Sequence, residues 1–466
     1  MRVCGCALRW IFSRPGLRCA RADRRQRAAP EDEVAGGVAD AAEERSPTKP
    51  PMKPCKEKKI IMHRKQNGAP YETILHAKGL SLWRSSASVI MSRMPDDLEQ
   101  RKVQHLDLAM KPEVEPGNDA LFNCVSLIHC ALPELSLSEI DLGAKLCGIT
   151  LRAPLMIVGM TGGTERAAAI NRELAQLAEE EGIAFGVGSM RAVLREPSSL
   201  KTFAVSPARP PLVMANLGAQ QLVETPDAAK KLIELLGADG ICIHLNPGQE
   251  LVQSEGDRDF RGCLDAIGKL AEALGDKLIV KETGCGISPA VAKQLASRGV
   301  RNLDVSGAGG TSWTRVEQMR AKAPRAERLG ALLSEWGIPT AAAVGAVSEL
   351  FELRPPGARM GYSAQAPGPK SPSDKMTILA SGGVRSGLDA ARAIALGADV
   401  VGFALPMLRA HQTGGIDAAR EVLQSFIEAL RAICLLTGSK DLAALRTAPR
   451  IMKEPLTGWL RQLGTR

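Results

Sequence analysis

Eight short apolar runs recur between residues 155 and 403, and their spacing is the strongest constraint on the fold. They span residues 155–158, 184–187, 212–215, 241–245, 278–280, 302–305, 376–380 and 400–403. Runs this short fit strands that are buried on both faces, as in parallel sheets. Eight strand–helix units over about 250 residues predict an α/β fold, a (β/α)₈ barrel of the TIM class, with a doubly wound open sheet as the alternative.

The segments between the runs carry helix signals at their ends. Apolar residues at helical spacing lead up to Gly182, which predicts a helix that ends there. Ser288, followed by a proline, predicts a helix start and Gly299 the end of the same helix. Ser386 and Gly397 bracket another helix in the same way. The alternation of strands and helices is therefore supported by the helix-capping residues as well as by the apolar runs.

Two segments interrupt the alternation. Residues 338–344 are apolar enough for a ninth strand, but Pro339 and Thr340 followed by alanines favour a helix start. Residues 354–375 are rich in Pro, Gly and Ser and predict a surface insertion before the seventh strand.

Residues 1–95 lack a sustained period and predict a disordered, basic extension ahead of a barrel domain over residues 96–466. Of the net charge of +9, +8 lies in residues 1–70, where 16 Lys or Arg stand against 8 Asp or Glu. A basic tail differs from a basic binding face, so we do not expect the barrel to bind nucleic acid. Eight Arg and one acid, Asp23, in the first 30 residues fit a transit peptide as well as an inert extension.

The composition limits the compartment. No apolar stretch approaches the roughly 20 residues of a membrane-spanning helix, so no membrane association is expected. The 11 cysteines are scattered without the spacing of a zinc site or a disulfide framework. We therefore expect reduced thiols in a cytoplasmic protein, or in an organelle if residues 1–30 direct transport.

The segment His244-Leu245-Asn246-Pro247-Gly248-Gln249-Glu250 places an imidazole, two amides and a carboxylate directly behind the apolar residues Ile241 to Ile243. Ligands bind at the carboxyl ends of the strands in parallel α/β proteins, so these side chains are expected to line a site. Glu250 is suited to bind Mg²⁺ through oxygen. The alternative is a polar loop that caps the following helix.

Three glycine-rich loops follow predicted strands. They are Met160-Thr161-Gly162-Gly163, Gly307-Ala308-Gly309-Gly310 and Ser381-Gly382-Gly383-Val384-Arg385-Ser386. Glycine permits close backbone approach, and amides at a helix start attract phosphate. The last loop is the strongest phosphate signal, because barrels commonly bind a cofactor phosphate after strands seven and eight, where Ala404-Leu405 also lie. A single loop of this kind is more often simply a tight turn, but three at the same end of the barrel favour a binding site.

Further polar side chains follow the remaining runs. They are Ser189 and Arg191 after the second, Asn216 after the third, Lys281 at the end of the fifth and Thr311 after the sixth. These donors suit a heterocycle edge or an anion. Ahead of the barrel, Arg101-Lys102-Val103-Gln104-His105 offers three cationic or cationisable groups, although such runs are usually solvated.

Together these motifs resemble a known family. The segments RKVQH at Arg101, MTGGT at Met160, GVGSMR at Gly186, ANLGAQ at Ala215, HLNPGQE at His244, VKETG at Val280, DVSGAGGTSW at Asp304 and ASGGVRSG at Ala380 are similar to those of the type II isopentenyl diphosphate isomerases. The resemblance covers roughly residues 95–466, apart from the insertion. It implies an FMN- and Mg²⁺-dependent interconversion of isopentenyl and dimethylallyl diphosphate, with NADPH to reduce the flavin, in a tetramer or octamer.

The resemblance also implies roles for individual residues. FMN would be held by Met160, Thr161, Gly162, Ser189, Asn216, Lys281, Thr311, Gly382, Gly383, Val384, Arg385, Ala404 and Leu405. The substrate would be bound by Arg101, Lys102, Arg191, Asn246 and Gln249, with Gln249, His105 and His244 as candidate catalytic residues and Glu250 as the metal ligand.

The chemistry fits this assignment. Moving a double bond adds a proton to one carbon and removes one from another, and neither carbon is acidic enough for ordinary carboxylate catalysis. In the family the reduced flavin is thought to act as the acid–base group. Two other functions stay open at this stage: an FMN-dependent oxidase of the hydroxy-acid kind, and an RNA-binding protein that acts through the basic tail.

Overall fold

The computed structural model describes residues 96–464, except Pro116, Asn118 and residues 352–375, and the backbone of a separate hairpin. In that hairpin β1 (His63–Gln66) pairs antiparallel with β2 (Ala69–Glu72). The chain divides into one unit over residues 1–88, which includes this hairpin, and another over residues 89–466. The predictions for the rest of residues 1–95 and for the insertion at 354–375 lie outside the described residues.

The larger unit is built on a closed barrel of eight parallel strands. They are β6 (Leu155–Ile157), β7 (Ala184–Gly186), β8 (Leu212–Gly218), β9 (Gly240–Leu245), β10 (Leu278–Glu282), β11 (Asn302–Asp304), β12 (Thr377–Ala380) and β13 (Val400–Phe403). Pairing of β13 with β6 closes the ring, which confirms the predicted barrel and excludes the open sheet. Asn216 lies inside β8 rather than after it, because this strand continues to Gly218.

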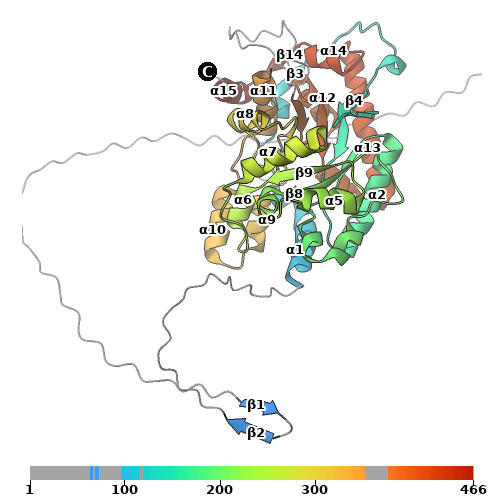
Figure 1. Ribbon diagram of the computed structural model, residues 1–466. Helices are drawn as coiled ribbons and strands as arrows, with labels where there is room; N and C mark the ends of the chain where they lie inside the picture. Colours follow the sequence, from blue (N-terminus) through green and yellow to red (C-terminus); the bar gives the residue numbers. More distant parts are fainter. Residues whose placement is uncertain are drawn as a thin grey trace, which may run out of the picture. The chain divides into compact units, whose positions relative to one another are not determined.

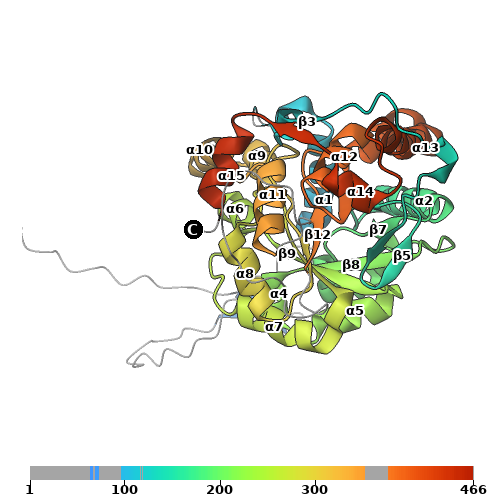
Figure 2. The same cartoon turned by 90° about the horizontal axis from the view of Figure 1, so that it is seen from above.

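Helices surround the barrel, as the view along its axis shows (Figure 2). They are α2 (Glu165–Glu181), α3 (Arg191–Arg195), α4 (Ala219–Glu224), α5 (Ala228–Leu236), α6 (Pro247–Val252), α7 (Cys263–Leu274), α8 (Pro289–Ser297), α9 (Trp313–Arg320), α10 (Pro324–Leu333), α11 (Thr340–Leu350), α12 (Gly387–Ala395), α13 (Leu405–Leu436), α14 (Leu442–Thr447) and α15 (Leu456–Leu463). The predicted caps are confirmed: Gly182 is left-handed, and Ser288 and Ser386 accept backbone bonds. The helix predicted at 338–344 is α11.

The two ends of the barrel are closed differently. At the amino-terminal ends of the strands, β4 (Ala144–Leu146) and β5 (Ile149–Leu151) form a hairpin whose leucines pack on the interior core with Met156 and Met214. At the other end lies α1 (Asp96–Ala109) (Figure 1). Apolar packing seals the amino-terminal end and polar groups gather at the carboxyl end, as expected for the barrel class.

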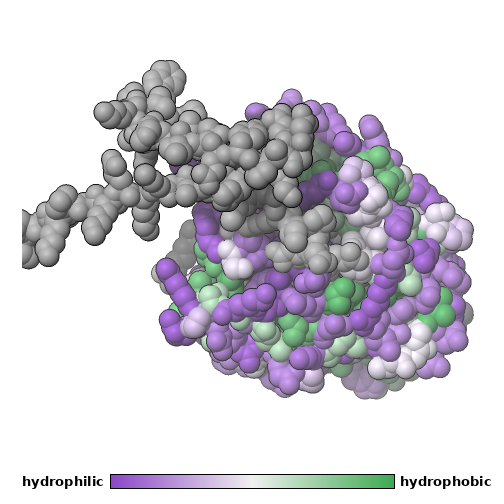
Figure 3. Space-filling view, turned by 90° about the horizontal axis from the view of Figure 1, so that it is seen from below, coloured by the Kyte–Doolittle hydropathy of each residue, from purple (hydrophilic) through white to green (hydrophobic). Residues whose placement is uncertain are grey.

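The surface on the α1 side is mainly hydrophilic where it is described, with apolar side chains in small groups (Figure 3). None of the helices within the described residues combines the length and apolar character needed to cross a bilayer.

The hairpin at the amino-terminal end generates a stability prediction. Leu146 is 1% exposed, whereas Ile149 on the same hairpin is 37% exposed. Leu146→Ala should lower the free energy of unfolding by about 2–5 kcal/mol, because it leaves a cavity in the barrel interior. Ile149→Ala should cost about 1 kcal/mol or less. Denaturant midpoints measure both, and equal losses would contradict the assignment of Leu146 to the barrel core.

Candidate functional site

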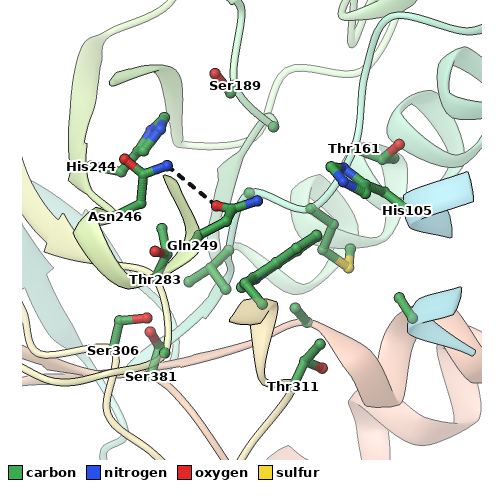
Figure 4. Close-up of a pocket in the computed structure, with 18 of the residues that line it drawn as sticks. His105, Thr161, Ser189, His244, Asn246, Gln249, Thr283, Ser306, Thr311 and Ser381 are labelled. Carbon is green, nitrogen blue, oxygen red and sulfur yellow. Dashed lines mark hydrogen bonds between the residues drawn. The ribbon is translucent and has the colours of Figure 1, made fainter. Parts of the chain in front are cut away.

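An open cavity of about 1570 Å³, which includes space open to solvent, lies at the carboxyl ends of the strands. The predicted residues that line it are Arg101, Lys102, His105, Met160, Thr161, Ser189, Arg191, Asn216, His244, Asn246, Gln249, Glu250, Lys281, Thr311, Gly382, Gly383, Val384, Arg385, Ala404 and Leu405. Gln249 lies near the middle, with His105 across from Asn246 (Figure 4).

Gly162 is the one predicted site residue that does not line this cavity. It faces Phe203 instead, and a Cβ at this position would come within 1.9 Å of the phenyl ring. The glycine is therefore required by packing behind the site, which the sequence motif does not distinguish from ligand contact.

The cavity lining is strongly cationic. Its charged side chains are Arg101, Lys102, Arg191, Lys281 and Arg385 against the single carboxylate Glu250. Burial and the charge of Arg101 lower the pKa of Lys102 to about 8, although Glu317 opposes this shift. Like charges held together in a partly dry space repel, so the arrangement favours an anionic ligand.

Four residues in register form a layer across the mouth of the barrel. Gly218 of β8, His244 of β9, Lys281 of β10 and Asp304 of β11 are aligned partners on adjacent strands. A Cβ at Gly218 would lie 3.1 Å from His244 Nε2, so the small residue leaves room for the imidazole. Strand pairing therefore places the imidazole beside the ammonium group without any contribution from loops.

His244 is neutral and its tautomer is fixed. Asn216 Nδ2 donates to the Val187 carbonyl at 3.0 Å, so its Oδ1 must accept the 2.8 Å bond from His244 Nδ1. Burial and nearby cations, Lys281 foremost, lower the pKa of His244 to about 3. His244 Nε2 is thus a lone-pair acceptor in the free protein.

Two buried carboxylates hold the backbone around Lys281. Asp304 accepts bonds from the Ser381 hydroxyl at 2.8 and 2.9 Å, which ties the phosphate-type loop after β12 to β11. Glu282 accepts from the amides of Thr283 and Cys285 and so shapes the loop after β10. Burial raises the pKa of Asp304, and it raises that of Glu282 to about 7 against the opposing backbone bonds.

The glycines of the loops after β11 and β12 allow those loops to pack on each other. A Cβ at Gly310 would lie 2.5 Å from the Gly383 amide, and a Cβ at Gly382 would lie 2.2 Å from the Gly307 carbonyl. Gly382 and Gly383 also have positive φ angles of 97° and 75°. Side chains at these positions would separate the two loops, so the glycines shape the cavity wall.

The adjoining start of α13 is suited to a phosphate. Its N-cap, Ala404, makes no side-chain capping bond, so the first amides of the helix are not capped by a side chain. Arg385 is nearby, but its Nη2 donates to Glu115 Oε2 at 2.7 Å, and Arg409 Nη1 contacts the same carboxylate at 2.5 Å. The backbone amides therefore offer donors for an anion here, and Arg385 is partly neutralised by Glu115.

Glu317 of α9 joins the N-terminal helix to the site. This side chain, 1% exposed, accepts from His105 Nε2 at 2.9 Å and Gln249 Nε2 at 3.0 Å, and pairs with Arg320. Burial opposes ionisation, but the hydrogen bond from His105 and the charge of Arg320 hold the pKa of Glu317 at about 2. Burial lowers the pKa of His105, so neutral His105 donates its Nε2 hydrogen to the carboxylate.

Glu250 is buried and oriented by two donors. Asn246 Nδ2 donates to Oε1 at 3.0 Å, and the Asp257 amide donates to Oε2 at 2.8 Å. Asn246 Oδ1 is a buried oxygen without a partner among the described residues. A lone carboxylate beside a spare amide oxygen fits Mg²⁺, which binds to one or two carboxylates and otherwise to water and phosphate. No cluster of three or more His, Cys, Asp or Glu suited to a metal occurs in the described part of the chain.

Several residues of the site were not identified from the sequence. They are Glu317, Asp304, Glu282 and Asp257. Glu317 and Asp304 act through hydrogen bonds to partners far along the chain. Glu282 bonds to amides of the loop that follows it, and the Asp257 amide bonds to Glu250. A weak signal existed for Glu317, since it lies four residues after Trp313 of the DVSGAGGTSW motif and so one helical turn along α9. Charged residues in helices are usually solvated, so the position of Glu317 in the sequence does not by itself indicate a buried acid.

The role assigned to Glu317 leads to a prediction about α1. Glu317→Ala should leave His105 and Arg320 without their buried acceptor, at a local cost of about 3–5 kcal/mol. Amide hydrogen exchange across residues 100–109 should accelerate at least about tenfold, since that change needs only about 1.4 kcal/mol. The exposed Glu272→Ala on α7 is the control, and unchanged exchange in α1 would contradict the role of Glu317.

The chain is similar to proteins of known activity. It is 47% identical over 357 residues to an isopentenyl-diphosphate delta-isomerase of Synechococcus sp., covering 75% of this chain and 95% of the relative. It is 42% identical over 364 residues to the isomerase of Aeropyrum pernix, covering 77% and 91%. Residues 245–451 match the family model of FMN-dependent dehydrogenases.

Solved structures share the fold at low sequence identity. A flavocytochrome b2 variant with sulfite bound superposes with a TM-score of 0.52 at 14% identity, covering 74% of this chain and 81% of that one. A lactate oxidase of Pediococcus acidilactici gives 0.51 at 14%, covering 77% and 94%. These two likenesses concern the barrel alone.

Both matches cover more than nine-tenths of the relative's own length and about three-quarters of this chain. The chain therefore belongs to the type II, FMN-dependent isopentenyl-diphosphate delta-isomerase family.

Proposed function

We propose that this chain interconverts isopentenyl and dimethylallyl diphosphate, with reduced FMN as the acid–base cofactor, Mg²⁺ on Glu250 and NADPH as the reductant of the flavin. The observation that carries the proposal is the cavity lining, in which five cationic side chains face one carboxylate at the mouth of the barrel. A diphosphate and a flavin phosphate together supply the missing negative charge. The relatives named above support the identity of the substrate.

The residues around the glycine loops fit FMN. The uncapped start of α13 and the loop at Gly382 and Gly383 would receive its phosphate, and Lys281 would lie beside the ring system. When bound, the reduced flavin supplies a group that donates and accepts protons without net oxidation of the substrate. Thr161, Ser189, Asn216 and Thr311 would provide polar contacts around it. Figure 4 labels Thr161, Ser189 and Thr311 among the side chains that line the cavity.

The side of the cavity nearest α1 fits the substrate. Arg101 and Lys102 come from α1 and Arg191 from the start of α3, so cations from two elements face the proposed diphosphate. Gln249 is held by its bond to Glu317 and by the 3.2 Å bond from Asn246. The proposed catalytic role of Gln249, His105 and His244 is to orient the alkene and its protons, because both imidazoles are neutral in the free protein.

The hydroxy-acid oxidase alternative is less well supported. The oxidase-type structures share the barrel but only 14% of the sequence. Such an enzyme requires a histidine base, whereas burial and the surrounding cations lower the pKa of His244 to about 3. The basic tail on which an RNA-binding function would depend lies outside the described residues.

We propose a homo-oligomer in the cytoplasm. Large apolar side chains are exposed on the single chain, among them Leu132 (75%), Leu332 (78%) and Trp336 (68%), and their burial between subunits would account for them. The choice between a tetramer and an octamer stays a prediction, as does the organelle alternative for residues 1–30.

The metal assignment tests the proposed function directly. Glu250→Gln should lower isomerisation of isopentenyl diphosphate at least about 100-fold, because a bound cation contributes several kcal/mol of charge stabilisation. FMN content should not change, since Glu250 is proposed to hold the metal ion and not the flavin. Product formation is followed with increasing Mg²⁺, and the exposed Glu224→Gln on α4 is the control. Full activity of Glu250→Gln would refute the metal role.

The pKa of Lys102, at about 8, generates a pH prediction. The protonated ammonium binds the diphosphate, so affinity is present below pH 8 and lost as the pH rises through the pKa. KM should rise up to about tenfold per pH unit above 8, reflecting one proton. Lys102→Arg should remove this rise, because a guanidinium stays protonated.

The exposed Lys293→Arg on α8 is the control for that profile and should keep the rise in KM. A rise of equal steepness in Lys102→Arg would assign the titration to another group and contradict the role of Lys102.

A further inference from the structure

The turn that follows α6, Gly256-Asp257-Arg258, wraps around Glu250. The Asp257 amide donates to Glu250 Oε2 at 2.8 Å, and the Arg258 guanidinium donates to the Glu250 carbonyl. A Cβ at Gly256 would lie 2.0 Å from that carbonyl oxygen, so only glycine permits the contact. The turn therefore fixes both the side chain and the backbone of the proposed metal ligand.

The carboxylate of Asp257 points to a second part of the site. It lies 3.5 Å from Arg191 Nη1 at the start of α3, and it accepts from Gln221 Nε2 of α4 at 3.3 Å. Asp257 thus contacts elements that follow β7, β8 and β9, all at the same end of the barrel. It connects a proposed diphosphate-binding cation with the proposed metal ligand.

We propose that Asp257 is a positioning residue that sets Arg191 and Glu250 for one metal-bound diphosphate; this rests on the proposed function. The backbone of Asp257 orients the carboxylate that holds the cation, and its side chain orients the guanidinium that contacts the phosphate. A guanidinium has five N–H donors, and the single contact with Asp257 leaves the others for the ligand.

The ion pair with Asp257 holds the Arg191 guanidinium in a fixed position among the other cations of the cavity. The side chains of Arg191 and Asp257 are 16% and 25% exposed, so the pair is partly desolvated. Without a counter-charge, the other cations of the cavity would repel the Arg191 side chain. Binding of the diphosphate would then have to fix that side chain in one conformation, at a cost in entropy. The ion pair with Asp257 fixes the Arg191 side chain before the ligand binds, which lowers this entropic cost.

A neighbouring pair provides the matched control. Asp259 lies two residues further along and pairs with Arg261, but these side chains are 59% and 91% exposed. Its partner, Arg261, lies two residues away and does not line the cavity. Asp259→Asn therefore removes a carboxylate of the same type from the same segment without reaching the site.

The test measures binding of inorganic pyrophosphate with Mg²⁺ to the FMN-loaded protein by calorimetry. Asp257→Asn keeps the backbone amide that Glu250 needs but removes the charge facing Arg191. Its pyrophosphate Kd should rise about tenfold, as expected for the loss of one preordered side chain. Asp259→Asn should bind like the unmodified protein, and FMN content and thermal midpoint should stay constant in both.

A double-mutant cycle separates positioning from a general electrostatic effect. In Arg191→Ala, the added Asp257→Asn change should weaken pyrophosphate binding no further, because the side chain that Asp257 orients is gone. Unchanged Kd in Asp257→Asn, or full additivity in the double variant, would overturn the proposal. So would a joint loss of FMN and thermal stability in Asp257→Asn. Failure of the unmodified protein to isomerise its substrate would instead overturn the proposed function.

Discussion

Five cations share one cavity at the mouth of this barrel, and the arrangement of the surrounding groups depends on how their repulsion is offset. Arg385 is met by Glu115 and Arg191 by Asp257, while Lys281 lies in the same strand layer as Asp304. Lys102 and His244 show the consequence in their pKa values of about 8 and about 3, for which burial is the main cause and the neighbouring charges the second. The remaining charge is left for a ligand.

The carboxylates of the site are nearly all structural. Glu317 accepts from His105 and Gln249, and Asp304 accepts from Ser381. These acceptors fix the side chains and loops that face the ligands but do not line the cavity themselves. A site of this kind suits a reaction in which a cofactor moves the protons and the protein supplies orientation and charge.

The barrel could be predicted because its strands and helix ends are specified by residues that are close together in the sequence. Each strand is a short buried run, and caps such as Ser288 and Gly182 mark helix ends by interactions within a few residues. Most of the site followed as well, since residues behind strands converge wherever the fold is a parallel barrel.

The sequence could not reveal what long-range packing decides. Gly162 belongs to a ligand-type motif but is required by the ring of Phe203, 41 positions further along. Glu317 was overlooked because burial of an acid depends on His105 and Arg320, and only the docking of α1 brings His105 there. Asn216 was expected after its strand because the apolar run ends at residue 215. In the structure Leu217 and Gly218 still belong to β8, so Asn216 lies within the strand.

If this cavity holds a flavin that acts as an acid–base group, the flavin is not consumed in the reaction. The direct measurement reduces the FMN-loaded protein with dithionite under anaerobic conditions and adds isopentenyl diphosphate and Mg²⁺ without NADPH. We expect many molecules of the allylic isomer per flavin, with the absorption spectrum remaining that of reduced FMN. Oxidation of the flavin in step with product formation, or no allylic isomer at all, would contradict it.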